Sequence, residues 1–280
     1  MKRAISTPSR TKEILETYGL RARKNFGQNF LVDPIIVERC AKASGAEGAV
    51  VEIGPGIGGL TEQLAKVSKH VTAYEIDENL IPVLHDVLSD YDNVEIVLQD
   101  FLECDFDAKV KELKEIYGSV SVCANLPYYI TTPVLFRIFE CPEIERITVM
   151  VQKEVGERFA AKPNDSEYSA LSAEGQYLFD VKKLFTVPGR SFNPSPNVDS
   201  VIIQFVRKNT SLSKEELTSF FDLVRGCFKQ RRKTIYNNLR EYLDDSEKAK
   251  AALAEAGIEE GRRAQQLSVD ELRKIYEVLQ

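Results

Sequence analysis

Short apolar runs alternate with longer amphipathic segments between residues 49 and 150, and this pattern limits the possible folds more than any other feature. The apolar runs are "AVVEIG", "HVTAYEI" and "VEIVLQ", and the amphipathic segments between them are "GLTEQLAKVS" and "NLIPVLHDVLS". Strands that alternate with helices at this spacing form βαβ units and a parallel, doubly wound sheet. Two later runs, "SVSVCAN" and "RITVMVQ", continue the sheet as fourth and fifth strands. The sequence therefore predicts an α/β fold.

The pattern changes after residue 160. The runs "DVKKLFTVP" and "SVIIQFVR" have no clear crossover helix between them, and "GRSFNPSPNVD" joins them as a loop, so we expect an antiparallel pair at one edge of the sheet. Later segments are polar with apolar helical stripes, and Ser213 and Ser268 each precede a glutamate by three residues, the capping-box spacing. We predict a sheet domain at 1–207, including a basic N-terminal extension, and a small helical domain at 208–280.

Composition excludes several kinds of chemistry. The five cysteines are scattered without a CxxC pair, so neither a disulfide framework nor a thiolate zinc site is indicated, and we expect no metal. His70 and His85 are the two histidines, and we interpret both as structural or surface residues, which disfavours histidine-driven catalysis. No apolar run approaches the roughly 20 residues that span a bilayer, and "MKRAISTPSR" lacks the apolar core of a secretory signal. We expect a cytoplasmic protein.

The segment "VEIGPGIGGL" follows the first predicted strand and opens a helix. Gly54, Gly56 and Gly59 satisfy the pattern GxGxxG, in which glycine lets the backbone approach a ligand closely. Glu75 ends the second strand 21 residues after Gly54, where a carboxylate can bind a ribose hydroxyl. These residues alone fit either a dinucleotide or S-adenosylmethionine.

Two further carboxylates favour S-adenosylmethionine. Glu52 lies two residues before Gly54, where a dinucleotide fold usually has an apolar residue, and it can face the amino acid end of the ligand. Asp100 ends the third strand in "VLQDFL" and can accept a hydrogen bond from an adenine amino group. Each carboxylate alone could cap a helix or face water. Glu52, Glu75 and Asp100 end three successive strands, and ligands of such sheets bind at those strand ends.

The stretch "NLPYYI" ends the fourth strand, next to the glycine loop in the predicted sheet. An exocyclic amine on a base is a poor nucleophile, and the Asn125 side-chain oxygen and the Leu126 carbonyl can accept its two hydrogens, so that its lone pair points at a methyl donor. Pro127 fixes the direction of that carbonyl. Tyr128 offers a face on which a base can stack. We assign Tyr129 to packing alone.

Nine segments together make a specific resemblance. They are "KNFGQNFL", "VEIGPGIGGLT", "YEID", "QDF", "NLPYYI", "VQKEVGERF", "SFNPSPNVDS", "FKQRRKTIYNNL" and "RRAQQLSVDEL". In this order they resemble the small-subunit ribosomal RNA adenine dimethyltransferase family (KsgA/RsmA type), over essentially residues 10–280. The resemblance implies a Rossmann-like class I S-adenosylmethionine-dependent methyltransferase sheet. It also implies transfer of two methyl groups to N6 of each of two adjacent adenines in the 3′-terminal hairpin loop of 16S rRNA, late in 30S biogenesis.

The resemblance also assigns residues. Cofactor contacts fall on Asn29, Leu31, Gly54, Gly56, Glu75, Asp100 and Asn125. The catalytic tetrapeptide is Asn125, Leu126, Pro127 and Tyr128, and Phe192 resembles a second aromatic residue that stacks on the target adenine; its alternative is a loop anchor packed on the core. The implied partner is 16S rRNA within the 30S subunit, and we expect a monomer.

Three other functions remain open from the sequence. The related 23S rRNA adenine methylase of macrolide resistance shares the fold and the NxPY motif, although the "GPG", "QRRKT" and "QLSVDEL" segments favour the small-subunit enzyme. A non-catalytic assembly or transcription factor could keep the fold, but the intact "NLPY" and the three strand-end carboxylates disfavour it. An NAD-dependent dehydrogenase is the third alternative.

Charge distribution points to a nucleic-acid partner in spite of a net charge of −6. Residues 1–24 carry seven basic and two acidic side chains, and "RGCFKQRRK" at 225–233 carries five basic residues and no acidic one. We predict phosphate contacts from both clusters, although "QRRK" could instead pair with acids of its own domain. The predicted RNA-binding residues are Arg21, Arg23, Lys24, Arg231, Arg232 and Lys233.

Overall fold

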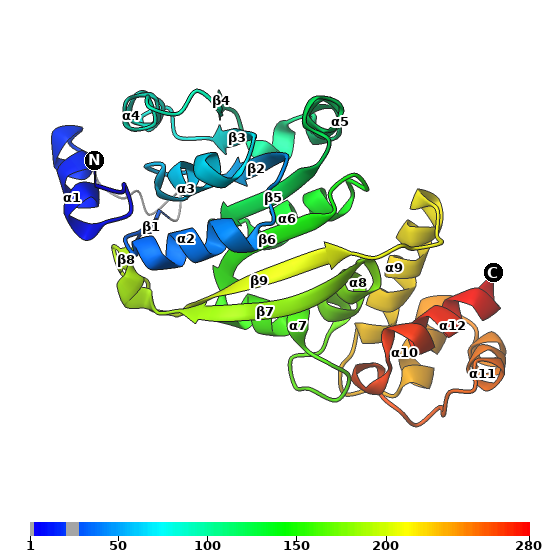
Figure 1. The fold of residues 1–280 in the computed structure, drawn as a ribbon. Coiled ribbons are helices and arrows are strands. Elements are labelled where there is room, and N and C mark those ends of the chain that lie inside the picture. The colour runs from blue at the N-terminus through cyan, green and yellow to red at the C-terminus, as the bar shows by residue number, and fades with distance from the viewer. Residues whose placement is uncertain (1–2, 21–27) are drawn as a thin grey trace. The chain divides into compact units, whose positions relative to one another are not determined.

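A seven-stranded sheet forms the centre of the N-terminal part of the chain (Figure 1). The structure, a computed structural model, describes residues 3–20 and 28–280. Its strands follow the order β4-β3-β2-β5-β6-β9-β7, and a separate two-stranded sheet pairs β1 with β8. The strands are β1 (Phe30–Leu31), β2 (Ala49–Ile53), β3 (His70–Glu75), β4 (Val94–Leu98), β5 (Val120–Asn125), β6 (Arg146–Gln152), β7 (Phe179–Val187), β8 (Phe192–Asn193) and β9 (Ser200–Arg207).

The strand directions confirm the predicted doubly wound sheet. The pairs β2–β3, β2–β5, β3–β4 and β5–β6 are parallel, and β9 is antiparallel to β6. At the edge, β7 and β9 lie side by side and run in opposite directions (Figure 1), as the sequence predicts. One ladder was not predicted, because β8 lies within the segment expected to be a loop and pairs with β1, with Leu31 opposite Phe192.

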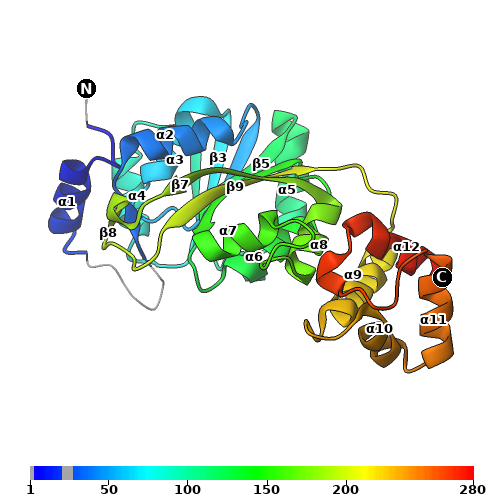
Figure 2. The ribbon, with the colours of Figure 1, turned by 90° about the horizontal axis from the view of Figure 1, so that it is seen from below.

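Helices cover both faces of this sheet, with α2 and α3 on one face and α5 and α6 on the other (Figure 2). All five residues of β2 are buried, as expected for a central parallel strand with both faces covered. One cluster of buried residues joins α2, α3 and the sheet through side chains such as Val37, Leu64 and Val71. The helices of this part are α1 (Pro8–Thr17), α2 (Pro34–Ala43), α3 (Gly59–Val67), α4 (Ile81–Val87), α5 (Phe106–Tyr117), α6 (Thr131–Phe139) and α7 (Lys153–Ala160).

The chain divides into two compact units. The first extends to Gly156 and includes Lys182–Arg207, and the second combines Glu157–Val181 with Lys208–Gln280. The predicted boundary at 207–208 is one of the points where the chain passes from the first unit to the second. The second unit also contains α8 (Ala170–Leu178), which the sequence grouped with the sheet.

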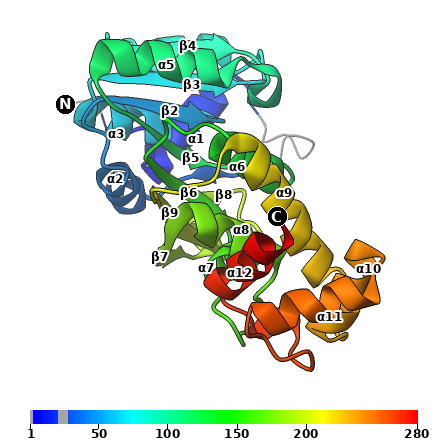
Figure 3. The same ribbon diagram turned by 90° about the vertical axis from the view of Figure 1, so that its right-hand side faces the viewer.

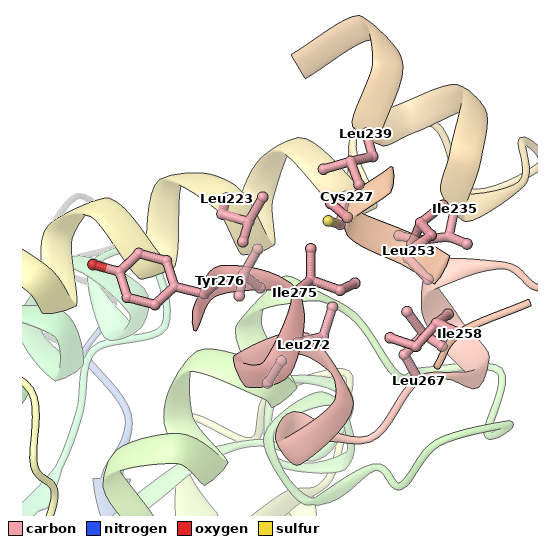
Figure 4. Packing of buried hydrophobic residues seen from close by; sticks show 14 of the residues in the cluster. Leu223, Cys227, Ile235, Leu239, Leu253, Ile258, Leu267, Leu272, Ile275 and Tyr276 are labelled. Atoms are coloured by element: carbon pink, nitrogen blue, oxygen red, sulfur yellow. The ribbon is translucent and has the colours of Figure 1, made fainter. Parts of the chain in front are cut away.

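The second unit is helical and has its own core. Its other helices are α9 (Lys214–Phe228), α10 (Ile235–Leu243), α11 (Ser246–Glu255) and α12 (Val269–Leu279). Helices α10 and α11 lie side by side (Figure 3), and Leu223, Leu239 and Ile275 are among the buried residues that join the helices (Figure 4). Both predicted capping boxes form, at Ser213 and Ser268.

The cysteines and His70, which could have carried other chemistry, have structural roles, and His85 is exposed on α4. All five cysteines are free and buried, as predicted. His70 stacks on Tyr117 at a ring-centroid distance of 4.9 Å. Among the residues described, no helix combines the length and apolarity that a membrane span requires.

Candidate active site

A cavity of about 310 Å³ lies at the carboxyl ends of the parallel strands, within the first unit. It is lined by residues at the ends of β2, β3 and β5, by the residues that follow β4, and by β1 with the residues before it. All the cofactor contacts predicted from the sequence line it, together with most of the predicted catalytic residues. These are Asn29, Leu31, Gly54, Gly56, Glu75, Asp100, Asn125, Leu126, Pro127 and Tyr128.

The glycine loop forms one wall of the cavity. Gly54 has φ +69° and Gly56 has φ +60°, values that residues with a Cβ rarely adopt. A Cβ on Gly54 would lie 3.6 Å from the Pro127 ring, and a Cβ on Gly56 would lie 3.3 Å from the Phe30 ring. The loop thus presents bare backbone to the cavity: the positive φ angles disfavour side chains at both positions, and a Cβ on Gly56 would also be tight against the Phe30 ring.

Glu75, at the end of β3, forms a hydrogen bond with this loop. Its Oε1 accepts hydrogen bonds from the backbone N–H groups of Ile76 and Asp77, both at 2.9 Å, and its Oε2 accepts from Gly56 N–H at 3.3 Å. Burial raises the pKa of Glu75, while the three N–H groups act in the opposite direction. A carboxylate has about four lone-pair sites, so acceptor capacity remains for a hydroxyl in the cavity.

Glu52 is the most deeply buried acidic residue of the cavity, with 1% of its surface exposed. By geometry its Oε2 has no hydrogen-bond partner in the described ranges, although the Thr61 hydroxyl lies near enough to lower the pKa of Glu52 against the larger effect of burial. Burial raises its pKa to about 8. A buried carboxylate oxygen without a donor costs free energy, and a positively charged ligand group would remove that cost. This unpaired oxygen fits a ligand that carries an ammonium group.

Asp100 follows β4 and begins a short 3-10 helix, η2 (Phe101–Glu103). Its Oδ1 accepts a hydrogen bond from Leu102 N–H at 2.9 Å. The carboxylate therefore caps η2 and lines the cavity at the same time. The capping interpretation and the ligand-binding prediction are compatible at this position.

The "NLPY" stretch presents two acceptors at the end of β5. Asn125 Nδ2 donates to the Asn29 carbonyl at 3.4 Å, which is a long contact. Because the amide nitrogen is used in this way, the amide oxygen Oδ1 is left as a hydrogen-bond acceptor. Leu126 N–H donates to the Met150 carbonyl at 3.2 Å. Within residues 3–20 and 28–280, no hydrogen bond is donated to Asn125 Oδ1 or to the Leu126 carbonyl.

The two tyrosines that follow differ in their surroundings. Tyr128 is partly buried, and its hydroxyl forms a 2.7 Å hydrogen bond with Ser200 Oγ at the start of β9. Tyr129 lines the same cavity but is 55% exposed. Tyr129 is therefore less covered by the protein than a residue that serves packing would be.

Phe192 lies apart from the predicted site residues that line the cavity. Only 4% of its surface is exposed, it packs in the cluster that contains Val37 and Ile202, and it does not line the cavity. Its pairing with Leu31 in the β1–β8 ladder explains this burial. The packing that the sequence left as its alternative is what the structure presents, and stacking on a target base stays a prediction.

Sequence reasoning missed several residues of the cavity, among them Gln28, Ile76 and Leu102. Gln28 Nε2 donates to Asp77 Oδ2 at 3.0 Å. Ile76 is 46% exposed and Leu102 is 38% exposed. Ile76 directly follows Glu75, and Leu102 follows Asp100 by two residues, so apolar residues beside strand-end carboxylates were the signal that could have found them.

The predicted RNA-binding residues Arg231, Arg232 and Lys233 lie in the turn between α9 and α10. Arg231, Arg232 and Lys233 are all exposed there. Arg231 donates to the Ser166 carbonyl, and Lys233 approaches Glu241 at 3.5 Å. The predicted contacts Arg21, Arg23 and Lys24 lie outside the residues that the structure describes.

Comparisons with known proteins agree with this geometry. Residues 19–280 match the family model described as "Ribosomal RNA adenine dimethylase". "Ribosomal RNA small subunit methyltransferase A" of Bacillus pumilus is 46% identical and is aligned over 100% of this chain and 99% of its own length. The protein of the same name from Bacillus licheniformis is 45% identical, over 97% of this chain and 96% of its own.

Two solved structures share the fold. The 23S rRNA methyltransferase ErmE has a TM-score of 0.70 at 28% identity and covers 90% of this chain and 99% of its own. A dimethyladenosine transferase from Plasmodium falciparum has a TM-score of 0.70 at 26% identity, over 87% and 94%. The predicted Rossmann-like class I methyltransferase sheet with a C-terminal helical region is confirmed.

Proposed function

The chain belongs to the ribosomal RNA adenine dimethylase family, and from this premise we propose that it transfers methyl groups from S-adenosylmethionine to N6 of two adjacent adenines in the 3′-terminal hairpin loop of 16S rRNA. The product is N6,N6-dimethyladenine, and the reaction belongs to late 30S biogenesis. The observation that carries this proposal is one cavity that holds three strand-end carboxylates beside the open acceptor pair of Asn125 and Leu126.

The cavity has a suitable group for each polar part of S-adenosylmethionine. Glu52, with its unpaired Oε2, fits the ammonium of the amino acid end. Glu75 has acceptor capacity for a ribose hydroxyl, and Asp100 is suited to the adenine amino group. When bound, S-adenosylmethionine supplies an electrophilic methyl group on a sulfonium. Asn29 and Leu31 also line the cavity and complete the proposed contacts.

The acceptor pair can activate an adenine amine without a general base. In the first transfer, Asn125 Oδ1 and the Leu126 carbonyl accept the two amine hydrogens, so that the nitrogen lone pair is freed from the ring and directed toward the methyl donor. The methylated nitrogen then releases one proton to water, and one hydrogen remains to be accepted in the second transfer. Pro127 O accepts from Ile130 N–H at 3.2 Å, and this turn fixes the stretch that carries the acceptors. Tyr128, held by Ser200, offers its ring to the target base.

The small subunit is favoured over the 23S alternative by the comparisons. Relatives at 44% to 46% identity bear the name small subunit methyltransferase A, whereas the 23S rRNA methyltransferase ErmE is 28% identical. We therefore take 16S rRNA within the 30S subunit as the partner.

Exposed basic side chains extend the proposal to contacts with the RNA backbone. Arg231, Arg232 and Lys233 contribute phosphate contacts because exposed cations bind the RNA backbone. From the sequence alone, we assign the same role to Arg21, Arg23 and Lys24. The protein acts as a cytoplasmic monomer and needs no metal for the transfer.

Methylation of defined RNA substrates tests the proposal. The protein is incubated with labelled S-adenosylmethionine and either immature 30S particles or protein-free 23S RNA, and modified nucleotides are mapped by mass spectrometry. We expect dimethyladenine at two adjacent positions near the 3′ end of 16S rRNA. Label on 23S RNA alone would establish the macrolide-resistance activity instead. Binding of 30S particles without any methylation would establish a scaffold.

A further inference from the structure

Tyr129 is the most exposed large apolar side chain of the cavity, at 55%. It follows directly on Tyr128, whose hydroxyl is tied to Ser200. Isolated exposed apolar residues are common, but one that lines a ligand cavity offers a surface for the ligand to cover. The proposed reaction has no part for this residue.

The two tyrosines lie toward opposite sides of β5. Tyr128 reaches Ser200 at the start of β9, which lies on the β6 side of the sheet. Tyr129 lies on the other side: α6, which begins two residues later, packs against η2, the turn that Asp100 begins. In agreement, the negative charges of Asp100 and Glu75 contribute, after burial, to raising the pKa of its phenol. Those carboxylates follow β4 and end β3, the strands beyond β2 in the sheet order. Tyr129 therefore belongs to the part of the cavity assigned to adenosine.

Tyr129 has two apolar companions in this part of the cavity. Ile76 is 46% exposed and Leu102 is 38% exposed, and both line the cavity. We call Ile76, Leu102 and Tyr129 the apolar rim. The rim lines the same cavity as Glu75 and Asp100, which accept hydrogen bonds, so it fits a flat heterocycle with apolar faces and polar edges.

We propose that Tyr129 packs across the adenosine of bound S-adenosylmethionine and slows its release, while Tyr128 serves the target base. The inference rests on the proposed function because it takes S-adenosylmethionine as the cofactor. It assigns the two adjacent tyrosines to different ligands, and it makes Tyr129 a determinant of cofactor residence time.

Binding of S-adenosylhomocysteine to three full-length variants tests this role without relying on activity. Calorimetry gives Kd and stopped-flow displacement gives the dissociation rate for Tyr129→Ala, Tyr129→Leu and Tyr129→Phe. Removal of one aromatic stacking partner should raise Kd and the dissociation rate about tenfold in Tyr129→Ala, with a smaller change in Tyr129→Leu. Tyr129→Phe keeps the ring and should stay within about twofold of the wild type. Thermal melting without ligand identifies any variant that fails to fold, and Tyr129→Leu then replaces Tyr129→Ala.

A second ligand locates the contact. Affinity for 5′-methylthioadenosine, which lacks the amino acid end, should fall by the same factor as affinity for S-adenosylhomocysteine. Unchanged Kd and dissociation rate for both ligands would overturn the inference. A raised KM for 30S particles with unchanged S-adenosylhomocysteine binding would also overturn it and place Tyr129 on the RNA side.

Failure of the inference can be distinguished from failure of the proposed function. If the wild type binds S-adenosylhomocysteine and Tyr129→Ala binds it equally well, only the inference fails. If Tyr129→Ala weakens binding but the wild type methylates no 30S particle, only the choice of RNA fails. A wild type that binds no S-adenosylhomocysteine refutes both.

Discussion

Asn125 in the first unit and Asn238 in the second end up with opposite hydrogen-bonding states. Asn238 is 1% exposed, its Oδ1 accepts from Gln230 N–H at 3.2 Å, and its Nδ2 donates to the Gln230 carbonyl at 3.1 Å. Asn125 has one long contact, from Nδ2, to the Asn29 carbonyl. The first asparagine keeps an acceptor open toward a cavity, and the second closes a turn between two helices.

Two buried glutamates repeat this difference. Glu174, 2% exposed, is bound by Arg225 through two hydrogen bonds of 3.0 and 2.9 Å in the second unit. Glu52, 1% exposed, has an oxygen without a donor among the residues described. Unpaired buried groups are costly, and because Glu52 lines the cavity at the strand ends, its unpaired oxygen marks a place where a ligand would complete the structure.

The largest effect is expected from Asn125→Ala. Removal of one of the two acceptors aimed at the amine should lower the methylation rate at saturating substrate by 100- to 1,000-fold. The free energy of unfolding should change little, because the hydrogen bond from Asn125 to the Asn29 carbonyl is long and therefore weak. The rate is measured in single turnovers on 30S particles, with S-adenosylhomocysteine binding as a check of the cavity.

Asn238→Ala is the matched change in the second unit. It leaves the Gln230 N–H and carbonyl unpaired and should lower the free energy of unfolding by about 2 kcal/mol, measured in urea. Binding of S-adenosylhomocysteine below the unfolding transition should be unaffected. Equal decreases of stability in both asparagine variants would contradict the contrast between the two units.

Glu52→Gln should change how stability depends on pH. Because the pKa of Glu52 is about 8 in the folded chain and 4.5 in its ordinary state, the folded protein holds a proton that the unfolded chain releases. The free energy of unfolding of the wild type should therefore fall by about 2 kcal/mol from pH 6 to pH 8. Denaturation without ligand should show no such fall in Glu52→Gln, while the exposed Glu47→Gln should retain it.

The double change Arg231→Glu and Arg232→Glu should weaken binding to 30S particles about tenfold at moderate salt and flatten its salt dependence. Both side chains are exposed in the turn between α9 and α10. The control reverses the same charge at Lys69 and Lys111, which are exposed in the first unit. Affinity for S-adenosylhomocysteine should stay constant in both. Unchanged particle binding in the Arg231 and Arg232 variant would refute this surface.

The smallest effect is expected from Ser200→Ala, which removes the hydrogen bond that holds Tyr128. One such bond is worth about 1 kcal/mol, so kcat should fall roughly fivefold with no change in S-adenosylhomocysteine affinity. In a Tyr128→Phe background the same substitution should add nothing, because the bond is already absent. If the two substitutions lowered kcat additively, Ser200 would act independently of Tyr128.

Much of the site follows from sequence because parallel topology places strand ends in one row. The residues that end β2, β3 and β5 must meet at one end of the sheet once the βαβ pattern is recognised, and Asp100 follows β4 at the same end. This holds without any knowledge of side-chain contacts, and it explains why Glu75, Asp100 and Asn125 were identified together.

The features that local patterns do not predict depend on long-range contacts. The burial of Phe192 results from pairing with Leu31 across more than 150 residues. The exposure of Tyr129 depends on what the rest of the chain leaves uncovered above the cavity. The grouping of Glu157–Val181 with the C-terminal helices likewise depends on packing of α8 against α9, through pairs such as Tyr177 and Phe220.

Hydrogen exchange of the full chain with and without S-adenosylhomocysteine tests the central claim most directly. We predict slower exchange at residues 54–59, 75–77, 99–102 and 125–129, around the cavity, and no change in α9 to α12. Protection located in the helices of the second unit, or no protection at the strand ends, would contradict it.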